Sequence, residues 1–185
     1  PHAKRVLCSI PLRIGQDAEE FVWNGFLTGL QDKEVHLLEF LRMGYQFGAD
    51  VMDMLTNDTV ATLQKAVRHL QGEINHYMGF VRFSDFDGVL VSVIEPKNHV
   101  LPLLAPHFTD RFNGEVFLIH DKTHKNALIH QAGRHAIVPL DALTMPAPSE
   151  AEDYFRKLWT HFYHTIGIES RLNPRCRMSH MPKRY

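Results

Sequence analysis

The hydrophobic period of this chain changes at Gly79, which divides a helical part of the sequence from a part rich in strands. Before Gly79, apolar residues recur three and four positions apart, as on one face of a helix, in residues 17–30, 34–55 and 60–77. After it, short runs rich in β-branched and aromatic residues predict strands at residues 80–83, 89–94, 116–119, 127–130 and 136–140. A proline-interrupted helical segment covers residues 101–112. A final amphipathic helix has its apolar face at residues 155–166. Helices followed by a small, mainly antiparallel sheet and a closing helix indicate an α+β fold.

Several residues mark where these elements begin and end. Residues 56–58 supply capping side chains before the third helix. Ser149 with Glu152 forms a capping-box pattern that opens the last helix. Gly44 and Gly48, on the second helix, either admit a close helix neighbour or weaken the helix locally.

Length and charge place the chain among ordinary globular proteins. We expect residues 1–185 to form a single domain, because 185 residues lie within the usual range for one. With 20 Lys and Arg against 21 Asp and Glu, any attraction to nucleic acid must come from local patches. No apolar run is long enough to span a membrane, and Cys8 and Cys176 stand far apart. We therefore predict a cytoplasmic protein with no membrane partner and with two free thiols, a single disulfide being the alternative.

The last 15 residues concentrate positive charge without a single acidic residue. Pro174 and Pro182 keep this segment from forming a regular helix. Guanidinium groups and a terminal tyrosine suit phosphates and base faces, although an ordinary solvated tail has the same composition. The residues predicted to bind nucleic acid here are Arg171, Arg175, Arg177, Lys183, Arg184 and Tyr185.

Two further arginines are candidates for contacts with nucleic acid. Arg82 stands between Phe80 and Phe83, where it would reach a phosphate or a base, or pair with a carboxylate. Packing of this aromatic segment in the core is the alternative. Arg111 lies four residues after His107 and shares its helix face.

Polar residues gather at the ends of the predicted strands, where rigid scaffolds present functional side chains. The candidates for acid–base catalysis or for a divalent-metal site are Glu95, His99, His107, His120 and Asp121. Their spacing matches no compact metal motif, and with 13 histidines in the chain a structural or surface role is the alternative. The metal and any cofactor stay unassigned. A second candidate pair, Glu73 and His76, lies near the end of the third helix, and the alternative for His76 is a partly buried position or a favourable cation near the helix C-terminus.

Several specific strings give the chain a family resemblance. They include Phe40-Leu-Arg-Met-Gly44, Glu73-Ile-Asn-His-Tyr-Met-Gly-Phe-Val-Arg-Phe83, Ile94-Glu-Pro-Lys-Asn-His-Val-Leu-Pro-Leu-Leu-Ala-Pro-His-Phe108 and Met181-Pro-Lys-Arg-Tyr185. With these strings the chain resembles a bacterial family labelled "probable DNA metabolism protein". Members of that family occur alone or joined to a uracil-DNA-glycosylase-like domain, and accompany a radical-SAM protein with a suggested role in DNA repair or modification. The resemblance also implies a further N-terminal segment and a Trp after the final Tyr, which this sequence lacks.

Three functions follow as hypotheses. The first is a DNA repair or modification factor that binds DNA through its basic C-terminal segment. The second is a non-catalytic adaptor for a DNA glycosylase or radical-SAM partner. The third is a metal-dependent enzyme acting on nucleotides.

Overall fold

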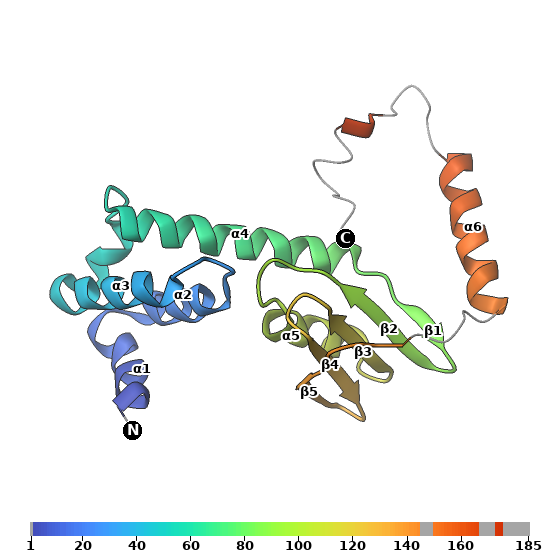
Figure 1. The fold of residues 1–185 in the computed structure, drawn as a ribbon, viewed down its shortest axis with the longest axis horizontal. Helices are drawn as coiled ribbons and strands as arrows, with labels where there is room; N and C mark the ends of the chain where they lie inside the picture. The colour runs from blue at the N-terminus through green and yellow to red at the C-terminus, as the bar shows by residue number, and fades with distance from the viewer. Residues whose placement is uncertain (1, 145–149, 167–172, 176–185) are drawn as a thin grey trace. The chain divides into compact units, whose positions relative to one another are not determined.

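The computed structural model describes residues 2–144, 150–166 and 173–175 (Figure 1). The chain divides into two compact units, of which the first comprises residues up to 73 together with 97–100. The second unit comprises residues 74–96 and the chain from 101 onward. Helices precede a mainly antiparallel five-stranded sheet, which confirms the predicted α+β class. Among the described residues, no helix is both long and apolar enough to cross a membrane.

The first unit is helical, as the sequence predicts. It contains α1 (His2–Arg13), α2 (Gln16–Leu27), α3 (Lys33–Phe47), the 3-10 helix η1 (Gly48–Asp53) and the first part of α4 (Asp58–Phe80). Its core joins the apolar faces of these helices, and the rings of Phe21 and Phe40 lie 5.0 Å apart at its centre. Val60, Leu63 and Val67 are buried in the same core, which confirms the predicted apolar face of α4.

Gly44 and Gly48 have different roles. A Cβ at Gly44 would lie 2.6 Å from Cδ1 of Ile14, the residue directly after α1, so glycine allows this part of the chain to approach α3 closely. Gly48 has φ 64°, a left-handed conformation that ends an α-helix. The helix predicted over residues 34–55 therefore stops at Phe47, and a 3-10 helix follows.

Asn57 caps the N-terminus of α4. Its Oδ1 accepts hydrogen bonds from the backbone N–H groups of Thr59, at 3.0 Å, and Val60, at 3.3 Å. We expect Asn57→Ala to lower the free energy of unfolding by about 1 kcal/mol, because these helix donors lose their acceptor. Urea denaturation followed by circular dichroism measures the effect. The exposed neighbour Thr56 provides the control, since Thr56→Ala should change stability by less than about 0.5 kcal/mol. Equal values for the two variants would contradict the cap.

The second unit is built on the sheet. Its elements are β1 (Ser84–Phe86), β2 (Val89–Ile94), α5 (Leu101–Arg111), β3 (Val116–Asp121), β4 (Asn126–Gln131), β5 (Arg134–Pro139) and α6 (Glu150–Ile166). The strands follow the order β1-β2-β3-β4-β5, and neighbours are antiparallel except for β2 and β3. That parallel pair is joined by the crossover that carries α5, which lies against β4 and β5 (Figure 1).

The prediction of a strand over residues 80–83 is wrong. Helix α4 continues through Phe80, and β1 begins at Ser84. Asp87 and Gly88 have φ 51° and 83°, the two positive values of a tight hairpin turn between β1 and β2. The aromatic residues of 80–83 therefore have a different role from strand pairing, and Phe83 shows it most clearly.

Candidate nucleic-acid interface

Phe83 anchors the segment that carries Arg82. Its ring packs against Phe108, Phe112 and Phe117, with centroid distances of 5.5, 5.1 and 6.1 Å. Phe117 of β3 is fully buried, and Phe108 of α5 is nearly so. Because Phe83 is fixed in this aromatic cluster, its neighbour Arg82 leaves the core at a defined place beside β1.

Arg82 lies over an aromatic ring of the closing helix. Its guanidinium carbon is 5.1 Å from the ring centroid of Trp159 on α6, within the range of a cation–π interaction. Trp159 nevertheless keeps 49% of its surface exposed, and Phe155, one turn earlier, keeps 63%. The pair thus combines a fixed positive charge with open aromatic surface.

Arg156 ties α6 to the start of β1. Its Nη2 donates to the hydroxyl of Ser84 at 2.9 Å, and its Nε donates to Oε1 of Glu152 at 2.8 Å. The hydrogen bond from Arg156 is the largest cause that lowers the pKa of Glu152, against the opposing effect of desolvation. Hydrogen bonds from the Ser84 side chain and the Asp85 backbone lower this pKa further. Nη1 of Arg156 takes part in neither of its two bonds to Ser84 and Glu152, so the guanidinium is both positioned and able to bind an anion.

Together these residues line an open hollow of about 540 Å³. It is bounded by Arg82, Phe83, Ser84, Glu152, Phe155, Arg156 and Trp159. Two arginines and two exposed aromatic rings accompany one carboxylate, whose charge is offset by Arg156. Such a lining suits a planar, anionic ligand.

The lowered pKa of Glu152 predicts how the contact of α6 with β1 depends on pH. A carboxyl whose pKa is lowered by folding stabilises the folded state above its ordinary pKa of 4.5, and this stabilisation is lost as pH falls through the lowered value. We expect Arg156→Gln to raise the pKa of Glu152, because the largest lowering contact is removed. A carbon-detected NMR titration of the glutamate carboxyl groups measures it. An unchanged pKa in the variant would contradict the assigned cause.

The predicted catalytic residues Glu95 and Asp121 lie at the ends of neighbouring parallel strands, since Ile94 pairs with Asp121. Glu95 accepts a hydrogen bond from Nζ of Lys122 at 2.7 Å, a pair in which both side chains are more than half exposed. Asp121 is buried. Its Oδ1 accepts from the backbone N of His124 at 3.0 Å, and its Oδ2 lies 2.7 Å from His124 Nδ1. A carboxylate that holds an imidazole is the arrangement of an acid–base pair, but the same contacts also stabilise the turn between β3 and β4.

The three predicted histidines lie in different surroundings. His120 is buried in β3, with its Nε2 3.1 Å from the carbonyl oxygen of Leu140. His107 on α5 packs edge-on against Phe108, and its buried Nε2 has no hydrogen-bond partner among the described residues. His99 belongs to the first unit, where its backbone N–H donates to Leu27. Within the described ranges, no group of three or more His, Cys, Asp or Glu residues is arranged to hold a metal ion.

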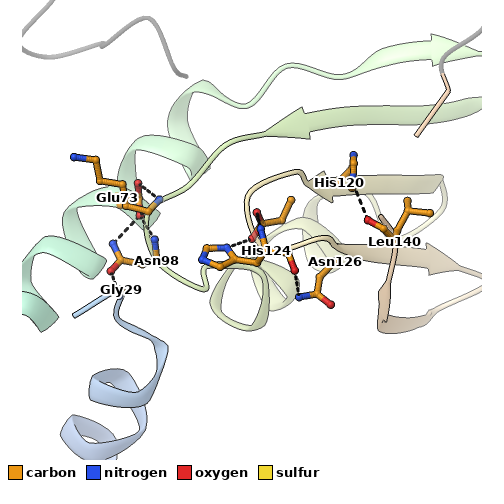
Figure 2. A network of polar contacts seen from close by, with 9 residues as sticks. Gly29, Glu73, Asn98, His120, His124, Asn126 and Leu140 are labelled. Atoms are coloured by element: carbon orange, nitrogen blue, oxygen red, sulfur yellow. Dashed lines mark hydrogen bonds and ion pairs between the residues drawn. The ribbon is translucent and has the colours of Figure 1, made fainter. Parts of the chain in front are cut away.

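Glu73, the other predicted candidate, has a structural role in the first unit (Figure 2). Its buried carboxylate accepts hydrogen bonds from the backbone N–H of Lys97, from the backbone N–H of Asn98 and from the Asn98 side-chain amide at 2.7 Å. Asn98 Oδ1 in turn accepts the N–H of Gly29 at 2.8 Å. Figure 2 also draws the separate hydrogen bond between His120 and Leu140 of the second unit.

The remaining predicted contacts with nucleic acid fall partly outside the described residues. Arg111 is exposed at the end of α5, with its guanidinium 5.6 Å from the ring centroid of Phe112. Arg175 is exposed. The other candidates of the basic segment lie outside the described residues: Arg171, Arg177, Lys183, Arg184 and Tyr185. The predicted capping residue Ser149 also lies outside them.

Three residues of the site are not among those predicted from the sequence: Arg156, Trp159 and His124. Arg156 follows Glu152 by four positions, the spacing of a helical ion pair, and the sequence contains this signal. His124 follows Asp121 by three positions, between two predicted strands. Nothing in the sequence places Trp159 beside Arg82, because that contact depends on tertiary structure.

The comparisons with known proteins give one family. No curated protein matches the chain, and no solved structure does. The sequence profile of DUF4130, described as a domain of unknown function, matches residues 31–185, which is most of the chain. The chain therefore belongs to the DUF4130 family of domains of unknown function.

Proposed function

We propose that this chain is a DNA repair or DNA modification factor that acts in the cytoplasm and contacts nucleic acid through the hollow between β1 and α6. The observation that supports this proposal is the placement of the Arg82 guanidinium over Trp159, beside the fixed guanidinium of Arg156. The family resemblance of the sequence to "probable DNA metabolism" proteins supports the choice of DNA.

Nucleic acids present two kinds of group that such a hollow could bind. Their phosphates attract arginine and lysine, and their base faces stack on aromatic rings and on guanidinium planes. The hollow provides both kinds of group within one space. The basic C-terminal segment would add phosphate contacts that do not depend on base sequence.

Substitution of Arg82, which lines the hollow, gives the sharpest test of this contact with DNA. We expect Arg82→Ala to weaken DNA binding about five- to tenfold at low salt, since the variant loses a cation at the aromatic surface. Fluorescence anisotropy of labelled single- and double-stranded DNA across a salt series measures it. The slope of log affinity against log salt should become shallower by about 0.7 to 0.9 for each phosphate that the variant no longer binds.

Arg134 provides the matched control. It is exposed on β5, at the opposite edge of the sheet from β1. Arg134→Ala should bind DNA as the unchanged chain does. If both variants bind normally, the hollow is not the contact. If the unchanged chain binds no DNA at low salt, the proposed function fails.

A second candidate, the non-catalytic adaptor, is favoured by the apolar surface of α6. Large apolar side chains are exposed along this helix: Tyr154, Phe155, Leu158, Trp159 and Phe162. Exposed apolar surface of this kind marks many protein interfaces. Co-elution with a purified uracil-DNA-glycosylase-like or radical-SAM protein would support an adaptor. Leu158→Ser should abolish the co-elution, because Leu158 lies outside the lining of the hollow and contributes only apolar contact.

A further inference from the structure

A second hollow on α6 adjoins the first one and has a different chemical character. It measures about 450 Å³ and is lined by Arg156, Lys157, Thr160 and His161. Arg156 lines both hollows, so the two have this side chain in common. The first hollow offers phenyl and indole rings, and the second offers nitrogen-bearing side chains without such a ring or a carboxylate among its described lining.

The helix geometry explains why the two kinds of group separate. Phe155 and Trp159 are four residues apart and share one face of α6, as do Lys157 and His161 on another. At about 100° per residue, Arg156 lies between these two faces. Averaged over all the α6 residues that line each hollow, with Arg156 in both sets, the two linings are centred about a third of a turn apart on a helix roughly 10 Å across, which is an arc of about 10 Å. A short stretch of extended sugar-phosphate chain covers such an arc.

The second hollow has the donors that a phosphate needs. Lys157 and His161 are exposed and carry side-chain N–H groups. The hydroxyl of Thr160 donates to the Arg156 carbonyl oxygen at 2.9 Å, so its proton is already engaged within the helix. Arg156, held by Ser84 and Glu152, adds a positioned charge at the boundary. Phosphate recognition would therefore rest on the side chains of Arg156, Lys157 and His161.

We propose that α6 binds single-stranded nucleic acid, with one unstacked base in the Arg82–Trp159 hollow and a neighbouring phosphate in the Lys157–His161 hollow. This inference rests on the proposed function and names its substrate class. Base faces in a duplex are covered by their neighbours in the stack, whereas a single strand can turn a base outward at little cost. The open surface of Trp159 and Phe155 fits such a base.

The test uses three labelled probes of equal length, about 12 nucleotides, which is within the site size of one single-strand-binding module. They are an oligothymidine strand, a strand with the same backbone whose sugars carry no bases, and a duplex containing the oligothymidine. We expect the chain to bind oligothymidine about tenfold tighter than the strand without bases, because the latter has no base to stack on the aromatic rings. It should also bind oligothymidine more tightly than the duplex.

Two variants separate the two hollows. Trp159→Leu should remove the preference for bases and leave affinity for the strand without bases unchanged. Lys157→Gln should weaken binding to both single strands by the same factor and make the salt slope shallower by about 0.7. Lys65→Gln, at an exposed lysine of α4 in the first unit, is the control and should change neither affinity. Circular dichroism checks that each variant keeps its helices.

The outcomes distinguish this inference from the proposed function. Equal affinity of the unchanged chain for strands with and without bases overturns the base contact, while DNA binding as such stands. Tighter binding to the duplex overturns the choice of single strands. If no probe is bound, the proposed function fails as well.

Discussion

Phe117→Ala is expected to lower the free energy of unfolding of the second unit by about 3–5 kcal/mol. The Phe117 side chain is fully buried, and its ring lies 6.1 Å from those of Phe83 and Phe112 and 4.9 Å from that of His130. Removing it deletes apolar contacts and leaves a cavity that its neighbours fill only in part. Urea denaturation followed by circular dichroism measures the loss.

Phe117→Ala is also expected to disturb the proposed nucleic-acid interface. Phe83 packs against Phe117, and Arg82 is the residue next to Phe83. A cavity beside Phe83 would therefore loosen the segment that holds the Arg82 guanidinium over Trp159. Phe155→Ala makes the same chemical change at a side chain that is 63% exposed. It should cost less than about 1 kcal/mol, and a similar cost for both variants would contradict the assignment of Phe117 to the core.

Glu73→Gln is expected to destabilise the first unit by about 2–4 kcal/mol. Glu73 is only 2% exposed, and its two carboxylate oxygens accept from the N–H groups of Lys97 and Asn98 and from the Asn98 side chain. A glutamine side chain has one acceptor oxygen, and its NH₂ group would face backbone donors. At least one buried donor then loses its partner.

Glu73→Gln should also disturb the backbone at Gly29, because the Asn98 side chain that the Glu73 carboxylate holds accepts the N–H of Gly29. A Cβ at Gly29 would lie 2.3 Å from the carbonyl oxygen of Lys97, so this contact leaves room only for glycine. Glu20, exposed on α2, is the matched control. Glu20→Gln should change stability by less than about 0.5 kcal/mol. A loss as small as this in Glu73→Gln would show that the buried carboxylate does not hold the segment at residues 97–98.

Much of the secondary structure could be predicted from the sequence, because the apolar periods of the core elements are strong. The apolar face of α4 is buried as predicted, and the strand at 89–94 coincides with β2. The segment at 80–83 is not the strand that its pattern predicts: Phe80 still belongs to α4, Phe83 enters the core, and Arg82 lies over Trp159. The parallel pairing of β2 with β3 depends on the path of the crossover, which no local pattern contains.

The candidate site is predictable only in part. The aromatic neighbours of Arg82 single it out in the sequence, and the structure places it beside Trp159 and Arg156. Glu73 has the pattern of a chemical candidate, yet its contacts are those of a buried structural carboxylate. The sequence indicates Asp121 without His124, because their pairing depends on a turn whose geometry the sequence does not give. Residues whose roles depend on tertiary contacts are those that the sequence leaves open.

Contact between nucleic acid and Trp159 can be observed through the fluorescence of this side chain. The chain contains two tryptophans, so Trp23→Phe leaves Trp159 as the sole reporter. Titration with unlabelled oligothymidine at low salt should quench its emission, at concentrations that match binding measured by anisotropy. Arg82→Ala in the same background should shift the quenching to higher concentrations. Binding by anisotropy without any change in Trp159 emission would contradict the account.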